Sequence, residues 1–491
     1  MRARFREPLA CPASVTFLEL TVPQLTLPGI TPAQPSVDHL PAAAFRRGPR
    51  TLTYADLEGR SLTDFTAPEE QAELVRLAGP WPVRWLFAPA ADDPDRAINL
   101  FGGCGGWCVG LRKILCADVD MVCIDKNRDA VATSNTAGCT AICADITTLD
   151  PEHPALRWTA ILIVSAPCTD WTLAGKRLGH LPHNLAILEE AVNRAAWAAG
   201  NYTWAETGEE DEDHPDYDPN FPPYYGPPSG ESWTEVRAVT DEMTAPTAKL
   251  MLEPVIWSLG LWRLGAPLHT VALEQSGALP EEVREWLSAE LYCAGWEHVV
   301  WEDLDAADYG SPSHRRRAFM AASRYRRLGT SPSLQVPEPL ITRASEAVGM
   351  DPDAVIITRG NRKTSGGNGF RMGRIVPGIT SKIRGWYKEG DPDFRFTVEQ
   401  IALLVTLPGD HPFVGSRTSV SRQAADIVAP VVSAAVMGCL LGTPWRQALA
   451  RYLAELYPIV HHNTHEQAVL TARTRPQPEA YATYGIALHA S

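Results

Sequence analysis

The sequence predicts an α/β protein built around a parallel sheet that is covered by helices. From Ala97 onward, short apolar runs alternate with segments of helical periodicity, which is the pattern of parallel strands joined by crossover helices. Apolar residues make up 45% of the 491 residues, so the chain can bury one large core or two to three ordinary ones.

Several apolar runs have the length of strands, and the segments between them have the spacing of amphipathic helices. The helical segments lie at 185–195 and 283–291, and the second stops before Gly295. After Arg324 the sequence becomes rich in Gly, Ser and Arg, and helical periodicity returns from Val398. We therefore expect the chain to leave the sheet and return to it. The expected strands are Ala97–Phe101, Met121–Asp125, Ala160–Ser165, Thr270–Glu274, His298–Trp301 and Ala318–Ala322.

Cysteine spacing and hydropathy favour a soluble protein of a reducing compartment. The ten cysteines include no CxxC pair, and several lie in apolar runs typical of buried free thiols. This spacing predicts no metal site. The first residues lack the apolar core of a signal peptide, and the longest apolar stretch, 429–442, is too short to span a bilayer. We expect a cytoplasmic monomer with no membrane partner.

The charge is unevenly distributed along the chain. The formal net charge of −14 opposes nonspecific attraction to nucleic acid, because such binding depends on neutralising phosphates with cations. Residues 206–218 are densely acidic, whereas 359–388 contain no acid. Local charge decides where a polyanion can bind. The predicted contacts to DNA in the basic segment are Arg359, Arg362, Lys363, Arg371 and Arg374.

Polar residues follow several of the expected strands, where a doubly wound sheet binds ligands. The first strand runs into a glycine-rich turn at 101–106, and Asp125 and Asp145 follow later strands. Glycines let the backbone approach a ligand, and a carboxylate at the second strand commonly holds ribose hydroxyls. A tight turn with two surface acids is the structural alternative, because such glycine patterns are weak signals.

A cysteine and an acid occupy two further strand ends. Cys168 follows Pro167 just after an apolar strand, which is where a nucleophile would lie. Most free cysteines are instead inert, buried small residues. Glu274 ends another strand, where partial desolvation would raise its pKa, although a capping or solvated glutamate has the same sequence. Arg315 and Arg317 alternate at the entry of a further strand and could bind phosphate or a base carbonyl.

Taken in order, these motifs resemble the DNA cytosine-5 methyltransferase family over about 97–442. The resemblance implies a Rossmann-like sheet with a smaller target-recognition domain, and S-adenosylmethionine as the cofactor. It also implies that Cys168, Glu274, Arg315 and Arg317 are catalytic. The implied cofactor-binding residues are Phe101, Gly103, Gly105, Gly106, Asp125, Asp145, Ile146 and Pro167.

The resemblance also divides the chain into regions. It implies a catalytic domain at 91–329 with an acidic insertion at 206–232, a target-recognition region at 330–390, and a return segment at 391–445 that completes the catalytic domain. An N-terminal extension of unknown fold (1–90) and a C-terminal tail (446–491) flank these regions. The partner it implies is duplex DNA with one cytosine flipped out, in a prokaryotic or phage-infected cell.

Departures from the family pattern keep other readings open. Asn99, Thr169, Gln275, Ser313 and Asp426 replace the family's Asp, Gln, Asn, Gln and Asn at the matching positions. The residues of the covalent chemistry are retained, and the altered ones position the cofactor and the base. The alternatives are methylation of cytosine in transfer RNA, transfer of a different group to cytosine, and a catalytically silent relative that binds DNA.

Overall fold

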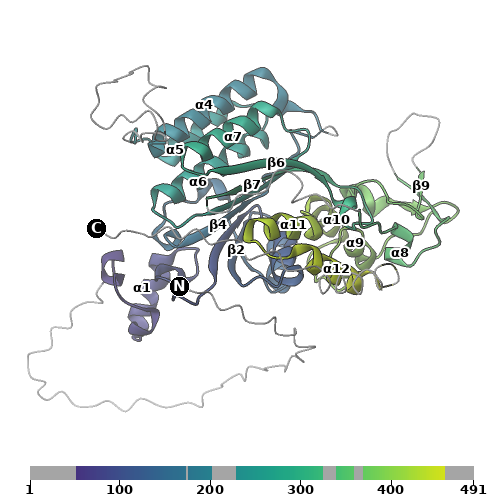
Figure 1. Ribbon diagram of the computed structural model, residues 1–491, viewed down its shortest axis with the longest axis horizontal. Coiled ribbons are helices and arrows are strands. Elements are labelled where there is room, and N and C mark those ends of the chain that lie inside the picture. Colours follow the sequence, from purple (N-terminus) through teal and green to yellow (C-terminus); the bar gives the residue numbers. More distant parts are fainter. Residues whose placement is uncertain are drawn as a thin grey trace, which may run out of the picture. The chain divides into compact units, whose positions relative to one another are not determined.

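The computed structural model describes residues 51–172, 175–201, 228–324, 339–358, 369–458 and 460. Its centre is a seven-stranded sheet in the order β3-β2-β1-β4-β5-β7-β6 (Figure 1). The expected α/β fold with a Rossmann-like sheet is confirmed. The strands are β1 (Asp95–Leu100), β2 (Val119–Asp125), β3 (Thr140–Cys143), β4 (Thr159–Val164), β5 (Thr270–Ser276), β6 (His298–Asp305) and β7 (Arg316–Ser323).

The expectation of a wholly parallel sheet is wrong at one edge. β1 to β5 pair in parallel, but β7 runs antiparallel to both β5 and β6. The chain passes from β6 to β7 through residues 306–315, which hold only a short 3-10 turn at Ala306–Asp308. Parallel neighbours need a long crossover connection, whereas a short one reverses the chain direction. β7 therefore lies between β5 and β6 in the opposite direction.

Helices cover both faces of the sheet. Along β4 the side chain of Leu162 joins a core formed with α4, α6 and α7, while Ile161 and Ile163 join a second core formed with α11 and α12. This alternation follows from the two-residue period of a strand. The helices are α1 (Pro68–Ala78), α2 (Gly106–Cys108), α3 (Arg128–Thr136), α4 (Pro182–Ala199), α5 (Trp233–Val239), α6 (Glu253–Arg263), α7 (Glu281–Cys293), α8 (Ala344–Val348), α9 (Val398–Leu404), α10 (Arg417–Asp426), α11 (Pro430–Leu441) and α12 (Trp445–Leu456).

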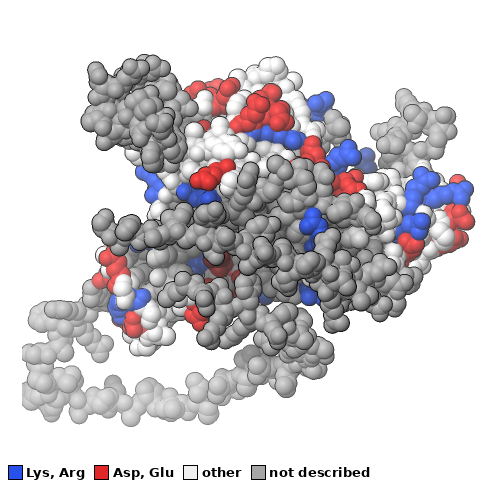
Figure 2. All heavy atoms as spheres, viewed as in Figure 1, with Lys and Arg blue, Asp and Glu red and all other residues white. Residues whose placement is uncertain are grey.

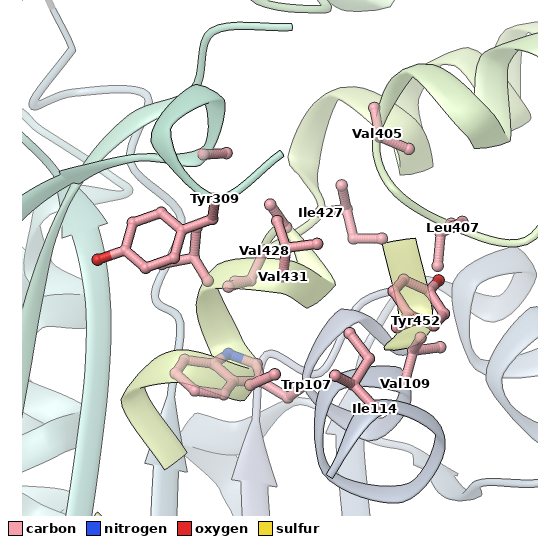
Figure 3. Packing of buried hydrophobic residues seen from close by; sticks show 14 of the residues in the cluster. Trp107, Val109, Ile114, Tyr309, Val405, Leu407, Ile427, Val428, Val431 and Tyr452 are labelled. Carbon is pink, nitrogen blue, oxygen red and sulfur yellow. The ribbon is translucent and has the colours of Figure 1, made fainter. Parts of the chain in front are cut away.

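The predicted return of the chain to the sheet is visible in the second core. α11 is buried along most of its length and packs on the π-helical turn η4 (Val109–Ile114) that continues α2. Figure 3 shows Trp107, Val428, Val431 and Tyr309 gathered in this core. α12 lies within the predicted C-terminal tail, and its residues Leu449 and Leu453 belong to this core.

A small three-stranded sheet, β10-β8-β9, forms within the segment between β7 and the return helices. Its strands are β8 (Val355–Ile357), β9 (Gly369–Arg371) and β10 (Tyr387–Lys388), and they pair antiparallel. Ile356 is fully buried here. The sheet lies within the region that the sequence assigns to target recognition.

Residues 51–90 fold onto the edge of the main sheet. α1 forms a small core with Leu52, Leu57 and Phe65. Trp85 donates from its indole Nε1 to a carboxylate oxygen of Asp120 on β2, at 2.7 Å. This part of the predicted extension is therefore packed against the sheet domain.

Two cysteines contradict the expectation of free thiols. Cys108 and Cys139 form a disulfide that joins α2 to the start of β3. The pair is 31 residues apart in sequence, so only the folding of the glycine-rich turn against α3 brings the two sulfurs together. The cysteine spacing therefore gives no argument for a reducing compartment. No cluster of three or more metal-ligating residues occurs in the described ranges.

One segment of the described residues, 417–441, is long and apolar enough to cross a membrane by length and composition. However, 78% of its most apolar window is buried inside the protein. The helix also breaks at Ile427, which has extended dihedral angles and separates α10 from α11. Burial inside the protein and a break in the helix are both typical of helices in a protein core.

Candidate active site

The glycine-rich turn after β1 leaves an open space beside its backbone. Phe101, Gly103 and Gly105 have φ angles of 58°, 54° and 97°, a left-handed conformation that glycine adopts readily. The Gly103 N–H donates to Asp125 Oδ2 at 3.0 Å, and a Cβ on Gly103 would meet no atom within 4 Å. Gly106 differs, because a Cβ there would lie 2.1 Å from the Val428 carbonyl oxygen. A glycine is therefore required at position 106, because the return segment packs against it.

The two predicted acids follow β2 and β3. Asp125 accepts hydrogen bonds from Gly103 and Asn127, and burial raises the pKa of its carboxyl. Asp145 accepts from the Thr147 N–H and lies 3.8 Å from Lys126 Nζ. Ile146 is buried. A cavity of about 520 Å³ lies beside Lys126, Asp145 and Thr147. Asp145 therefore borders space that a ligand could fill.

Cys168 lies four residues beyond the end of β4, in a half-buried turn. Its carbonyl oxygen accepts the N–H groups of Trp171 and Thr172, at 3.0 and 3.1 Å. The strand end before it is tied to the glycine-rich turn, because Trp107 Nε1 donates to Ser165 Oγ at 2.7 Å. Pro167 is half-buried in the same turn. The thiol therefore lies at the carboxyl edge of the sheet, beside the candidate cofactor turn.

Glu274 lies on the neighbouring strand at the same edge. Its predecessor Leu273 pairs with Val164, the last residue of β4, and Arg317 enters the sheet opposite Ser276. Glu274 is 5% exposed, and its Oε1 lies 3.0 Å from Arg317 Nε without the alignment of a hydrogen bond. A buried carboxylate with unused hydrogen-bonding capacity can bind a polar ligand.

Arg315 brings the return segment to this site. Its Nη1 donates to the Ala425 carbonyl oxygen at 2.6 Å, and its Nε has no hydrogen-bond partner among the described residues. The next residue, Asp426, ends α10, and its charge acts on Arg315 and Cys168. Burial lowers the pKa of Arg315 to about 10, which leaves the guanidinium charged at neutral pH.

The buried groups shift one another's ionisation. Burial raises the pKa of the Cys168 thiol, Arg317 acts to lower it and Glu274 to raise it. Burial also raises the pKa of the Glu274 carboxyl, against the effect of Arg317 and Arg315. The free protein at neutral pH therefore holds Cys168 mainly as the thiol. Such shifts are typical of sites that transfer protons.

The pH dependence of Cys168 alkylation is expected to report these neighbours. Because only the thiolate reacts, the rate of reaction with iodoacetamide should rise with pH through an apparent pKa above that of an ordinary thiol. Glu274→Gln removes a negative neighbour and should lower this pKa, and Arg317→Ala should raise it, each by about one unit. Mass spectrometry of the Cys168 peptide measures the rate, with the exposed Cys143 as internal control. Opposite shifts would contradict the arrangement.

Several residues of the return segment bind the glycine-rich turn, and the sequence did not predict them. His411 Nε2 lies 3.2 Å from the Cys104 carbonyl oxygen, and Cys104 Sγ donates to the Gln423 carbonyl oxygen at 3.6 Å. The Ser433 hydroxyl lies 3.2 Å from the Gly106 carbonyl oxygen. The resemblance implied that a return segment at 391–445 completes the catalytic domain, but no pattern pointed to these side chains.

Three departures from the family pattern have local partners. Gln275 donates to the Ala166 carbonyl oxygen at 3.2 Å, and Ser313 donates to the Leu404 carbonyl oxygen at 2.7 Å. Asn99 donates to Cys123 Sγ at 3.5 Å, while its Oδ1 is buried without a partner in the described residues. Gln275 therefore supports the strand end that leads to Cys168, and Ser313 anchors the turn before Arg315.

The predicted DNA contacts are only partly described. Arg359, Arg362 and Lys363 lie outside the described residues. Arg371 is exposed on β9 and forms an ion pair with Asp353 at 2.6 Å, and Arg374 is also exposed. Figure 2 shows Lys and Arg gathered over the β9 end of this segment, with Asp and Glu beside them. The basic charge of this surface is therefore partly neutralised.

Residues 96–184 match the family model of C-5 cytosine-specific DNA methylases. Over these residues the chain is therefore similar to C-5 cytosine-specific DNA methylases. It includes the glycine-rich turn, Asp125, Asp145 and Cys168, but ends before Glu274 and the two arginines. No match was found among curated proteins.

Solved structures with similar folds include three methyltransferases. A protein described as a DNA modification methyltransferase encoded within an E. coli prophage is 13% identical with a TM-score of 0.43, and the match covers 71% of this chain and 99% of that chain. Dnmt2 of S. pombe is 14% identical with a TM-score of 0.43, and the match covers 71% of this chain and 98% of that chain. DNMT2 of Spodoptera frugiperda is 13% identical with a TM-score of 0.39, and the match covers 71% of this chain and 99% of that chain. Such low values carry no argument about substrate.

C-5 cytosine methyltransferases of this fold use S-adenosylmethionine, which confirms the expected cofactor. The residues present fit it. Gly103 faces open space, Asp125 is a half-buried carboxylate at the end of β2, and Asp145 borders a cavity. These are the groups that bind the ribose and adenine parts of a nucleoside in doubly wound folds.

Proposed function

We propose that this protein is a DNA cytosine-5 methyltransferase in which Cys168 forms a transient covalent bond to a flipped-out cytosine. The observation that carries the proposal is the convergence of a thiol, a buried carboxyl and two arginines at the edge of the sheet that borders the glycine-rich turn. Arg317 lies 3.0 Å from Glu274, and the charges of Glu274, Arg315 and Arg317 act on the Cys168 thiol.

The chemistry requires a nucleophile because carbon 5 of cytosine is unreactive. The Cys168 thiolate would add to carbon 6, and Glu274 would donate a proton to ring nitrogen 3, so that the ring becomes an enamine. The cofactor supplies an electrophilic methyl group to carbon 5. A base would then remove the carbon 5 proton, and the freed electron pair would form the double bond between carbons 5 and 6 as the bond from carbon 6 to sulfur breaks. The proton on nitrogen 3 would return to Glu274, and the thiolate would be released.

The two arginines would hold the base in place. Arg317 lies beside Glu274 and would bind the carbonyl oxygen at carbon 2, where negative charge increases as the thiolate adds. Arg315 is hydrogen-bonded to Ala425 of the return segment and would support the wall of the base-binding pocket. Its Nε and that of Arg317 have no hydrogen-bond partner within the described ranges, so both can donate to a ligand.

The exposed cations near the site would contact the DNA backbone. Arg316 is exposed beside the two catalytic arginines. The 3-10 turn η13 (Ser381–Gly385), with Lys382 and Arg384 exposed, packs against α10. A flipped nucleotide costs a few kcal/mol of unstacking, which such contacts would offset. Duplex DNA is therefore the substrate that we favour over RNA.

A mechanism-based trap tests the proposal. Duplex DNA containing 5-fluorocytosine should form a covalent complex with the protein when S-adenosylmethionine is present, because fluorine at carbon 5 cannot leave as a proton. Equimolar transfer RNA carrying the same base forms the second arm. A complex with DNA alone supports the proposal, and one with RNA alone assigns transfer RNA as substrate. Mass spectrometry of nucleosides from ordinary substrate DNA identifies the transferred group. If both nucleic acids bind but neither forms an adduct, the result contradicts the proposal and favours a catalytically silent protein that binds DNA.

Asp125→Ala is expected mainly to weaken cofactor binding. The substitution removes a charged acceptor from the ribose position and the partner of Gly103 N–H, so the dissociation constant should rise by about 10- to 100-fold. Titration calorimetry with S-adenosylmethionine measures it. Asp118→Ala, an exposed acid just before β2, is the control. Unchanged affinity in the Asp125 variant would exclude this residue from the cofactor site.

A further inference from the structure

The turn that carries Cys168 is held by a residue pair outside the proposed catalytic set. Asp170 is 6% exposed although it lies two residues beyond the nucleophile. Its Oδ2 accepts the backbone N–H of Thr247 at 2.8 Å and the Thr247 hydroxyl at 2.6 Å. The Asp170 N–H donates back to Thr247 Oγ1 at 3.1 Å. Three hydrogen bonds thus join residues 77 positions apart in sequence.

The pair connects the turn to a rigid support. Thr247 precedes the 3-10 helix η10 (Ala248–Leu252), which continues directly into α6 under the sheet. Met251 of η10 is fully buried and contacts Gln275 Nε2 through its sulfur, at 3.0 Å. Gln275 in turn binds the Ala166 carbonyl oxygen before the nucleophile. The same support therefore holds the chain on both sides of Cys168.

The rest of the turn is held by packing. Trp171 is fully buried, and a Cβ on Gly179 would lie 2.6 Å from its ring. His180 packs edge-on against the indole and binds the Trp171 carbonyl oxygen at 3.1 Å. The Gly179 N–H donates to the Asp170 carbonyl oxygen at 3.1 Å. These contacts fix the part of the turn that follows Cys168.

We infer that Asp170 and Thr247 are positioning residues that fix the direction of the Cys168 thiol toward the base. The inference rests on the proposed function. A nucleophile must be held within a few tenths of an ångström of its attack position, which requires supports with locked conformations. Buried hydrogen bonds from the carboxylate of Asp170 are strong supports of this kind. The sequence singled out Cys168 but gave no sign of Thr247, which follows Pro246 in a loop.

Paired substitutions in the full chain test the inference. Asp170→Ala and Thr247→Val each remove the hydrogen bonds of one side chain, and leaving the buried partner unsatisfied should slow adduct formation on 5-fluorocytosine DNA by about 10-fold or more. Asp170→Asn and Thr247→Ser keep an acceptor or a hydroxyl and should retain at least about a third of the wild-type rate. The double variant Asp170→Ala, Thr247→Val should be no slower than the slower single variant, because the two residues act as one unit.

Two controls separate positioning from folding. Thr159→Val, at the start of β4, makes the same exchange where the buried hydroxyl has no hydrogen-bond partner among the described residues, and should leave the rate unchanged. The affinity for S-adenosylmethionine should stay within about twofold in every variant, because none of these groups lies on the cofactor turn. A wild-type rate in Asp170→Ala, or equal losses in the alanine and asparagine variants, would overturn the inference.

A second measurement distinguishes failure of this inference from failure of the proposed function. The rate of Cys168 alkylation by iodoacetamide, followed by mass spectrometry across pH, reports on the thiol without DNA or cofactor. The profile should change in Asp170→Ala and Thr247→Val and recover in Asp170→Asn and Thr247→Ser. If the wild type forms no adduct but this pattern holds, the proposed function fails and the positioning role stands. If adduct forms but the pattern is absent, the positioning role fails alone.

Discussion

Replacing Cys168 by alanine is expected to abolish methyl transfer, lowering kcat by at least about 10⁴-fold, because no other group can add to carbon 6. The affinity for cofactor should remain near that of the wild type, since the thiol is not part of the glycine-rich turn. Transfer of tritium from labelled S-adenosylmethionine to duplex DNA measures the effect.

The matched control for this experiment is Cys293→Ala. Cys293 ends α7 on the outer side of the sheet, and its removal should leave the rate unchanged. Retained activity in the Cys168 variant would remove the covalent mechanism, whatever the substrate. Loss of activity together with loss of cofactor binding would point to misfolding, and thermal unfolding of both variants distinguishes that case.

Glu274→Gln is expected to lower kcat by about 10²- to 10⁴-fold while preserving the shape of the site. Glutamine can accept and donate hydrogen bonds but cannot give a proton to ring nitrogen 3. The trap with 5-fluorocytosine DNA should show slower adduct formation, since the step affected is the addition of the thiolate.

Glu302→Gln on β6 makes the same exchange on a strand beyond the site and is its control. The pH profile provides a second readout. Because burial raises the pKa of both Glu274 and Cys168, wild-type activity should be highest between the two pKa values. In the glutamine variant the loss at high pH should disappear, since no proton remains to be lost from this position. A variant within threefold of wild type would exclude proton donation by Glu274.

The sheet and the position of the site could be predicted from sequence because strand ends carry a local signal. Asp125, Cys168 and Glu274 each follow an apolar run, and the carboxyl ends of parallel strands meet at one edge. Two of these runs, 121–125 and 270–274, lie inside observed strands. The third, 97–101, extends one residue beyond the end of β1. Motif order added the arginines, which periodicity alone could not assign.

Contacts between distant segments could not be predicted in the same way. β3 is short and half-exposed, so its residues 140–143 lack the apolar run that marks the other strands. The bonds of His411 and Ser433 to the glycine-rich turn, and that of Thr247 to Asp170, depend on tertiary packing over long separations. A single polar side chain in a helix or loop has no periodicity from which its partner could be inferred.

The dependence of the glycine-rich turn on the return helices sets an order of events during synthesis. The turn is translated early, at residues 101–106, yet its seat is made by Val428 and Ser433 near the other end of the chain. Domains emerging from the ribosome fold as their residues become available. The nascent chain can therefore complete its sheet at residue 323, more than a hundred residues before the segment that supports this turn has been synthesised.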